Sequence, residues 1–180
     1  IAIGVSNQTE TVGFAYFPNP DFEVGMDVFI SDDYVARRFV GSETTNFDYE
    51  IMLHEIYHAL GLKHPFEADG DNTNVLGSRE DTSPYTVMSY NLDPSTFAGD
   101  ARVLDLMPLT ALYGVNPSYR LEDDTYEFSN SSGVFIVDGG GRDTVAYQGS
   151  QNVFVDLRSG GHSFIGSKSA YITSANPLTI

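Results

Sequence analysis

Apolar and polar side chains alternate in short runs along the first thirty residues of the chain. This alternation predicts strands over residues 1–5, 12–17 and 26–30. The Pro18-Asn19-Pro20 segment ends the second run, so the first two strands are predicted to form a hairpin-like unit. No period is clear between Ser31 and Thr45, and this stretch is predicted to be mostly loop.

The clearest helical pattern covers residues 48–60. Thr45 precedes Asp48 with the spacing of a capping box, and Gly61 is a favourable residue just past the end of a helix. One face of this helix is apolar and is predicted to be buried. That face consists of Met52, Leu53, Ile56, Ala59 and Leu60.

Residues 65–84 are rich in Gly, Asn, Asp and Ser and are predicted to form a long loop, which is often a functional feature. A second helix is predicted over residues 104–113. Asp105 is its expected N-cap and Pro108 is expected in its first turn. Gly114 is expected to end it.

Beyond residue 116 the pattern changes to short β runs between turns. These runs cover residues 125–128, 134–137, 144–147 and 153–157. The change predicts two domains, residues 1–116 and 117–180. Apolar residues make up 41% of the chain, which is the balance of a globular rather than a disordered protein.

Charge and composition exclude several classes of function. The chain has 25 acidic and 9 basic residues, and this excess of acid disfavours nucleic-acid binding, which needs Lys and Arg on phosphates. The acidity suits a secreted protein or a calcium binder, although solubility alone explains it equally well. Because there is no cysteine, any zinc must be held by His and carboxylate. No apolar run is long enough to span a membrane.

The first helix carries the complete motif H-E-x-x-H-x-x-G-x-x-H, from His54 to His64. His54 and His58 lie one helical turn apart, about 40° around the axis, so both imidazoles can bind one ion. Gly61 lets the chain leave the helix sharply, which returns His64 as a third ligand. Three protein ligands leave one zinc position open for water. Glu55 can then act as the general base on that water, while zinc polarises the scissile carbonyl.

The length of this motif determines how specifically it indicates a zinc site. A bare H-E-x-x-H can occur on any helix by chance, but the extended form is far more specific. Three of the chain's four histidines fall in it, which argues against a purely structural role for all three. His162 lies outside the motif and is interpreted as an ordinary surface or packing residue.

A second segment, Thr86-Val87-Met88-Ser89-Tyr90, follows 24 residues after His64 when counted to its Met. Taken alone, Met88 would be plain core. At this distance behind a zinc motif it is interpreted as the Met of a Met-turn, the tight turn beneath the zinc of metzincins. Tyr90 is then a candidate zinc ligand or a hydrogen-bond donor to the developing oxyanion. The alternative for Tyr90 is a packed aromatic residue in a turn.

These segments resemble the serralysins, secreted bacterial proteases of the metzincin type. Residues 54–65 resemble the family's zinc helix, and Met88-Ser89-Tyr90 resembles its Met-turn with the following tyrosine. Residues 112–116 resemble the end of the last catalytic helix, and residues 138–144 resemble the turn that opens the calcium-binding C-terminal domain. Residues 1–18 are weakly similar to the family's central strands.

The resemblance implies an α+β fold. A metzincin-type catalytic domain, with a mixed sheet, a zinc helix and a Met-turn, is expected to be followed by the start of a calcium-binding β-rich domain of the β-roll type. The implied cofactors are zinc (Zn2+) and calcium (Ca2+). The implied activity is zinc-dependent hydrolysis of peptide bonds in extracellular proteins after export from a bacterial cell. Expected partners are protein or peptide substrates, which add to an edge strand beside the zinc cleft by backbone pairing, and a proteinaceous inhibitor.

Two features depart from the family pattern. Tyr57 stands where serralysins usually carry Gly, so an altered cleft wall is expected there. The chain starts without Met or a leader, lacks the family's early helix and first strands, and ends without tandem Gly-rich repeats. It is therefore interpreted as a processed or excised piece of a longer protein.

Residues 138–145 also match one degenerate copy of the calcium repeat G-G-x-G-x-D-x-U. Asp138, Gly140, Gly141 and Asp143 offer about half of the six to eight oxygens that calcium needs. By the resemblance, the carbonyls of Arg120, Glu122 and Asp124 would supply more. A plain Gly-rich turn explains this single copy almost as well, and the acidic residues 122–124 also suit a solvated loop.

Two other functions remain open at this point. The chain could be a calcium-stabilised binding or adhesion module with a vestigial zinc site, although all the catalytic residues are present. It could also be a gluzincin-like enzyme with a downstream Glu ligand, but His64 already supplies the third ligand.

Overall fold

The computed structural model describes residues 1–38, 44–94, 101–114, 116, 118–129, 136, 138–158, 163–165 and 168–170. The chain divides into two compact units, Ile1–Ala101 and Arg102–Ile180, and each is described by itself. The predicted domain division at residue 116 lies inside the second unit and stays a prediction. His162 and most of the run predicted at 134–137 lie outside the described residues.

The first unit contains a three-stranded sheet formed by β1 (Ile3–Ser6), β2 (Gly13–Ala15) and β3 (Val28–Ser31). The strand order is β1-β3-β2, with β1 parallel and β2 antiparallel to β3. All three strands are therefore present, but the predicted hairpin-like unit of the first two is wrong because β3 lies between them. Alternation of side chains identifies a strand without identifying its neighbours.

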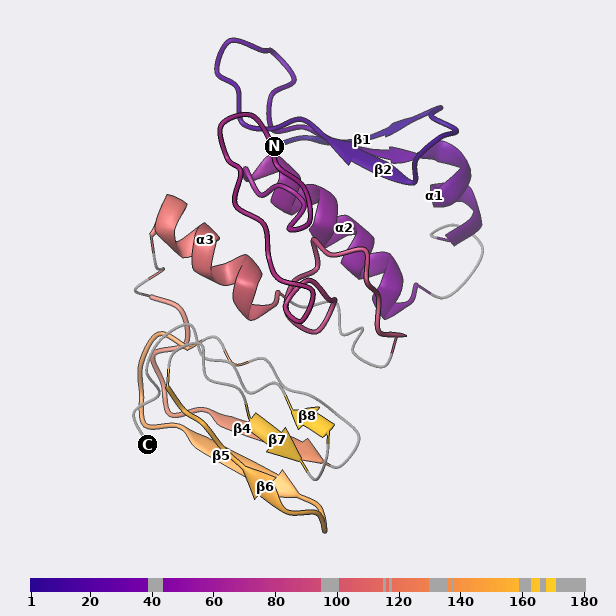
Figure 1. The fold of residues 1–180 in the computed structure, drawn as a ribbon. Helices are drawn as coiled ribbons and strands as arrows, with labels where there is room; N and C mark the ends of the chain where they lie inside the picture. The colour runs from indigo at the N-terminus through magenta and orange to yellow at the C-terminus, as the bar shows by residue number, and fades with distance from the viewer. Residues whose placement is uncertain are drawn as a thin grey trace. The chain divides into compact units, whose positions relative to one another are not determined.

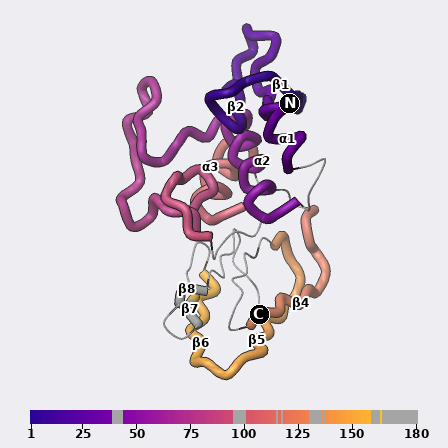
Figure 2. The backbone as a smooth tube through the Cα atoms, turned by 90° about the vertical axis from the view of Figure 1, so that its right-hand side faces the viewer, coloured from indigo at the N-terminus to yellow at the C-terminus, as the bar shows by residue number. Residues whose placement is uncertain are grey.

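Helix α2 (Asn46–Ala59) packs on one face of this sheet, as both Figure 1 and the view turned by 90° in Figure 2 show. Val28 and Ile30 of β3 and Ala59 of α2 are buried together at this contact. Partly buried side chains complete the core; they are Ala15, Met26, Tyr34, Val35, Met52 and Ile56. The sheet and α2 thus form the two layers that position the histidine motif.

The predicted apolar face of α2 is only partly the buried one. Ala59 is buried, whereas Met52, Leu53, Ile56 and Leu60 are half-buried. The other buried positions of the helix are Asp48, Glu50, Glu55 and Tyr57. The prediction of the buried face from helical periodicity fails here. Several polar residues of this helix are buried against specific partners or at a functional site, and are not exposed.

Helix α1 (Asp32–Arg38) occupies a stretch that was predicted to be mostly loop. It is short and has no buried residue, so its sequence carries little apolar periodicity. Acidic residues in its first turn and basic residues in its last turn suit the helix dipole.

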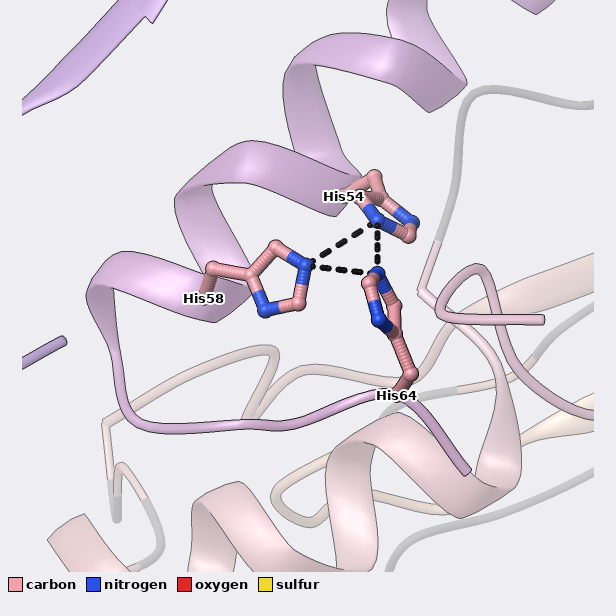
Figure 3. A group of neighbouring side chains, drawn as sticks. All are labelled: His54, His58 and His64. Atoms are coloured by element: carbon pink, nitrogen blue, oxygen red, sulfur yellow. Dashed lines mark hydrogen bonds between the residues drawn. The ribbon is translucent and has the colours of Figure 1, made fainter. Parts of the chain in front are cut away.

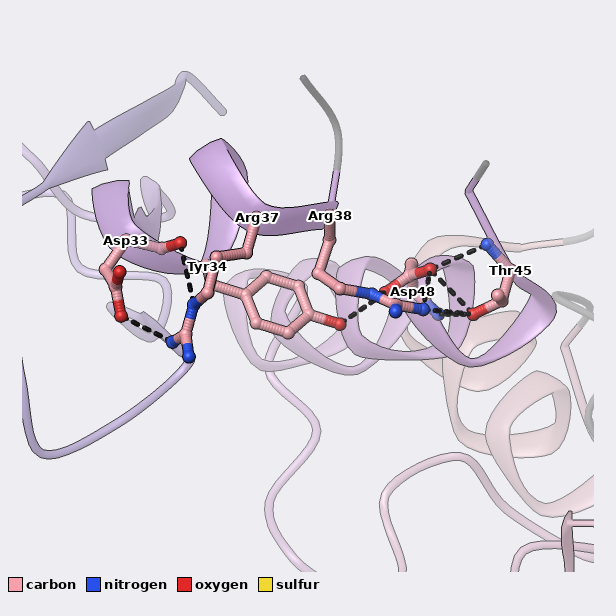
Figure 4. Close-up of polar contacts among 6 residues, drawn as sticks. All are labelled: Asp33, Tyr34, Arg37, Arg38, Thr45 and Asp48. Carbon is pink, nitrogen blue, oxygen red and sulfur yellow. Dashed lines mark hydrogen bonds and ion pairs between the residues drawn. The ribbon is translucent and has the colours of Figure 1, made fainter. Parts of the chain in front are cut away.

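A polar network joins α1 to the start of α2 (Figure 4). The Tyr34 hydroxyl donates to Asp48 at 2.5 Å, and the Arg38 guanidinium bonds both Asp48 oxygens at 2.9 and 3.0 Å. The Asp48 carboxylate also accepts the Thr45 backbone N–H at 2.6 Å, which completes the predicted capping box. The guanidinium of Arg38, followed by these other donors, holds the pKa of Asp48 well below its usual range.

Replacing Asp48 with Ala is expected to lower the free energy of unfolding by about 2 kcal/mol, because it removes the cap and leaves the Tyr34 hydroxyl without its acceptor. Urea denaturation at pH 7 measures this difference. Since the pKa of Asp48 is depressed in the folded state, its contribution is present above the unfolded pKa of about 3.9 and is lost as the pH falls below it. The matched control is Asp33→Ala, which removes an exposed ion pair with Arg37 and should change stability little.

The second unit begins with α3 (Val103–Tyr113). Its N-cap is Arg102, and the carboxylate of Asp105, three residues later, accepts the Arg102 backbone N–H at 2.9 Å. The prediction of Asp105 as the N-cap is therefore wrong by three positions, and Pro108 lies beyond the first turn, inside the helix. Gly114 ends the helix as predicted, with a φ of 82° that favours glycine.

The remaining described part of this unit is β-rich. β4 (Thr125–Ser129) pairs in parallel with β5 (Thr144–Gln148). A second sheet contains β6 (Val153–Phe154), β7 (Ser163–Ile165) and β8 (Lys168–Ala170), all antiparallel. Tyr126, Phe128 and Ile136 form a buried cluster. In the part of the chain that the structure describes, no helix is long and apolar enough to cross a membrane.

Candidate metal centre

Three histidines of the first unit converge on one point (Figure 3). His54 and His58 project from α2, and His64 comes from the segment that follows the helix. The turn between them requires Gly61, whose φ is 97°, a value that residues with a Cβ rarely adopt. Backbone hydrogen bonds from Gly61 to His58 (2.9 Å) and from Leu62 to Tyr57 (2.8 Å) hold this turn.

The three Nε2 atoms lie 3.0 to 3.2 Å from one another. In a tetrahedral zinc site with Zn–N bonds of about 2.0–2.1 Å, ligand nitrogens are about 3.3 Å apart. The triad therefore has the spacing of three facial ligands of one metal ion, with His54, His58 and His64 forming a possible metal-binding group.

Each imidazole uses its other nitrogen, Nδ1, to bond a fixed acceptor. The Nδ1–H of His54 donates to the Val87 carbonyl at 2.8 Å, and that of His58 donates to the Leu62 carbonyl at 2.7 Å. The Nδ1 of His64 pairs with the Glu67 carboxylate. These acceptors place the proton on Nδ1, so all three Nε2 atoms carry a lone pair toward the common point.

Burial keeps two of these rings neutral. It lowers the pKa of His54 to about 4 and also lowers the pKa of His58. Imidazole nitrogens whose lone pairs converge on one point repel one another unless a cation lies between them. The donor set thus fits a metal ion that imidazole binds, such as zinc.

Glu55, next to His54 in the motif, is buried with 7% of its surface exposed. Its Oε2 atom has no hydrogen-bond partner among the described residues. Burial raises the pKa of this carboxyl to about 7. A Cβ added at Gly13 would lie 2.8 Å from the Glu55 Cγ, so β2 passes directly beside this side chain. An unpartnered buried carboxylate oxygen requires a proton, a water or a substrate group.

The segment containing Met88 and Tyr90 lies against the same histidines. Val87 accepts the His54 hydrogen bond, and Met88 is buried, with its backbone N–H bonded to the Thr86 hydroxyl at 3.0 Å. The Tyr90 ring lies 5.7 Å from His54 and 4.7 Å from His64, centroid to centroid. It is 63% exposed, so it contacts the imidazoles on one side and solvent on the other.

The second unit brings together three of the predicted calcium ligands. Carboxylate oxygens of Asp124, Asp138 and Asp143 lie within 4.8 Å of one another. Asp138 and Asp143 are buried. The predicted ligands also included the carbonyls of Arg120 and Asp124, but in the structure these accept backbone N–H bonds.

The turn around the other calcium candidates needs its glycines. A Cβ on Gly141, whose φ is 108°, would lie 2.1 Å from the Glu122 carbonyl oxygen. Gly140 donates its N–H to Asp138 at 2.8 Å. The absence of a Cβ at Gly141 thus allows the two backbone segments to approach closely.

The sequence identified Tyr90 beside the triad, but it did not identify the acceptors behind the triad or the rings of Phe17 and Phe66 beside it. Glu67 follows His64 by three residues, a spacing that could have indicated a contact. The carbonyls of Val87 and Leu62 carry no sequence signal. Tyr57, which was expected to alter a cleft wall, is buried and presents little surface to a substrate.

No protein-family model matches the chain. The chain is 29% identical to the serralysin of Proteus mirabilis, over 94% of its own length and 43% of the relative's. It is 28% identical to metallopeptidase AprA of Pseudomonas marginalis, over 97% and 43% of the two lengths. The chain is serralysin-like.

A third relative extends the agreement at higher identity over a shorter range. Serralysin G of Dickeya chrysanthemi is 32% identical over 74% of this chain and 33% of its own length. The serralysin-like chain spans about two fifths of the length of the first two relatives. The similarity confirms the resemblance inferred from the motifs.

Proposed function

We propose that this chain is the catalytic core of a zinc-dependent metalloendopeptidase of the metzincin type. One observation carries the proposal. Three imidazole nitrogens converge within 3.2 Å of one another next to Glu55, whose buried Oε2 has no partner among the described residues. His54, His58 and His64 would hold the ion. Similarity to relatives named serralysin and metallopeptidase supports the assignment.

Bound zinc supplies Lewis-acid chemistry, which polarises the scissile carbonyl and lowers the pKa of a water. Glu55 accepts the proton of that water and then delivers it to the leaving amine. Burial, which raises the pKa of this carboxyl, makes it a stronger base toward the proton of the water. Tyr90 is proposed to donate a hydrogen bond from its phenol to the developing oxyanion, or to ligate the metal at rest.

The free edge of β2 is the proposed binding site for the substrate backbone. β2 is an edge strand of its sheet, and among the described strands only β3 pairs with it. Val12 and Tyr16 direct their backbone groups to the β3 side. By the alternation of an antiparallel ladder, Gly13 and Ala15 direct theirs to the free edge, beside Glu55. An extended peptide can add there as a further strand.

Met88 is proposed to be the Met of the Met-turn. Its burial and its place next to Val87 support this role, because Val87 accepts the hydrogen bond that orients His54. A rigid segment at this point fixes the ligand ring, and ring orientation affects metal affinity. Gly61 is the corresponding structural residue on the other side of the triad.

Metal analysis of the purified chain, paired with a casein assay, tests the proposal. We expect about one zinc per chain, as three converging imidazoles imply, and hydrolysis that depends on it. Zinc at this stoichiometry with no cleavage of casein or unfolded peptides would instead support a binding module with a vestigial site.

We further propose that the second unit binds calcium. Support comes from the three clustered carboxylates of Asp124, Asp138 and Asp143. Carbonyl oxygens of Glu122, Gly140 and Gly141 are the remaining candidates, and the Arg120 carbonyl could join them only by giving up the N–H groups of Gly139 and Gly140. On this proposal residues 117–180 are the start of a calcium-binding β-rich domain and residues 1–116 the catalytic domain.

Adding calcium to about 10 mM is expected to raise the midpoint of thermal unfolding by a few degrees, since affinities of extracellular calcium modules are about 10⁻⁴–10⁻³ M. Asp143→Asn should abolish this shift. Asp123→Asn is the matched control, because Asp123 is exposed and its carboxylate bonds the Arg142 N–H outside the cluster. An equal calcium shift in the parent and in Asp143→Asn would contradict the site.

Location and partners follow from the proposed enzyme. We propose that the protein acts outside a bacterial cell on protein or peptide substrates. A proteinaceous inhibitor that inserts a chain segment at the same edge of β2 is a further proposed partner.

A further inference from the structure

Gly13 of β2 lies directly against the side chain of Glu55. A Cβ built on Gly13 would lie 2.8 Å from the Glu55 Cγ, 2.9 Å from its Oε1 and 3.0 Å from its Cδ. Carbon atoms at such distances repel strongly, since their optimal separation is about 3.5–4.0 Å. These are the three heavy atoms nearest to that position, so Glu55 fills the space that a side chain at residue 13 would need.

The direction of the missing side chain follows from the sheet register. Gly13 pairs with Ile30, and register partners on neighbouring strands direct their side chains to the same face. Ile30 packs with Ala59 of α2 in the core, so residue 13 faces α2 and not the free edge of β2. A Cβ at Gly13 would therefore point at Glu55 and leave the backbone groups of that edge accessible.

The backbone conformation does not by itself require a glycine at this position. Gly13 does not have the positive φ that favours glycine. A glycine within a strand weakens the strand and often marks a place where another group approaches closely. The group that approaches Gly13 is the Glu55 side chain, so the clearance for this side chain is what a residue without Cβ provides here.

If a Cβ were added, Glu55 would move more easily than β2. The Glu55 Oε2 has no hydrogen-bond partner among the described residues, so no such bond holds this oxygen in place. β2, by contrast, is paired with β3 along its whole length. Rotation of the carboxylate away from β2 is the expected response. Misplacement of a reacting group by about 1 Å can lower a rate by about 10²-fold.

We propose that Gly13 is a positioning residue for peptide hydrolysis. Its missing side chain leaves the space in which the Glu55 carboxylate lies, in the orientation from which it accepts the proton of the water. Gly13 acts through Glu55 and takes no part in the chemistry itself. This inference rests on the proposed peptidase function and adds to it a residue outside the histidine motif.

Kinetics of Gly13→Ala test this role. The variant should keep its zinc and lower kcat for a fluorogenic peptide by about 10²-fold, while KM changes by less than about 3-fold. In a Glu55→Ala background the same substitution should change the residual rate by less than about 2-fold, because the group that it displaces is already absent. An unchanged rate, a loss in KM alone, or an equal loss in both backgrounds overturns the inference.

Thermal unfolding of the metal-free protein tests the same contact without any activity. With Glu55 present, Gly13→Ala should lower the midpoint by about 2 °C or more, as overpacking does. In the Glu55→Ala background it should instead raise the midpoint by about 1–4 °C, because alanine restricts the unfolded chain more than glycine does. The sign of the shift should thus depend on the Glu55 side chain, and equal shifts in the two backgrounds contradict the inference.

Gly4→Ala is the matched control. Gly4 lies in β1 of the same sheet, but it pairs with Phe29, and a Cβ there would meet only the Phe29 ring, at 3.4 Å. Its shift of the midpoint should be the same with and without the Glu55 side chain.

The two measurements separate failure of this inference from failure of the proposed function. An active parent in which Gly13→Ala and Glu55→Ala act independently overturns only the positioning role. A zinc-loaded parent that cleaves no peptide overturns the peptidase, and the unfolding midpoints then still decide whether Gly13 sets the place of the Glu55 side chain.

Discussion

Glu55→Gln is expected to lower the rate of peptide hydrolysis by about 10²–10⁴-fold while the protein keeps its zinc. The amide has the volume of the carboxylate but cannot accept the proton of the water. Metal binding should persist because the proposed ligands are the nitrogens of His54, His58 and His64, and Glu55 is not one of these residues. Hydrolysis of a fluorogenic peptide gives the rate, and atomic absorption of the same sample gives the zinc content.

Glu50→Gln is the matched control for this change. Glu50 lies in the same helix and is 6% exposed, against 7% for Glu55. The variant makes the same chemical exchange at a similar depth, so the rate per zinc-loaded molecule should stay near that of the parent. If Glu55→Gln cleaved the peptide as fast as the parent, the general-base assignment would be wrong.

The local parts of the site could be predicted because helix geometry fixes them. Two histidines four residues apart must lie on one face, and a glycine seven residues after His54 permits the turn that returns His64. The capping box of Thr45 and Asp48 is equally local and is present as predicted. Each of these features depends on residues within one or two helical turns.

The non-local parts could not be predicted from the same patterns. The parallel pairing of β1 with β3 joins residues 25 positions apart, such as Ile3 and Val28, and neither strand's alternation encodes it. The acceptor for His54 is a backbone carbonyl, that of Val87, which any residue type would provide. Helix α1 was missed because Tyr34 and Val35, which pack on the core, are adjacent and form no repeating apolar stripe, while the polar Asp48 network joins the helix to α2.

His64→Ala is expected to weaken zinc binding by about 10³-fold and to abolish hydrolysis. Structural zinc sites bind with about 10–16 kcal/mol, so one ligand among three or four accounts for several kcal/mol. The remaining pair, His54 and His58, keeps its own acceptors and its helical spacing. Competition with a chromophoric chelator measures the affinity, and addition of excess zinc should restore little activity.

Glu67→Gln tests the hydrogen-bond partner of the His64 ring and should lower the zinc affinity less than His64→Ala does. Glu67 pairs with the Nδ1 of His64, and loss of such a contact typically lowers metal affinity by 10–100-fold. Glu80→Gln removes an exposed charge from the same long loop and should leave the affinity unchanged. The order His64→Ala, then Glu67→Gln, then Glu80→Gln follows because His64 supplies one of the converging Nε2 atoms, Glu67 pairs with the other nitrogen of that ring, and Glu80 is exposed in the loop. If His64→Ala bound zinc as tightly as Glu80→Gln, the ion would have to be held without the third imidazole, and the turn at Gly61 would have no role in the metal site.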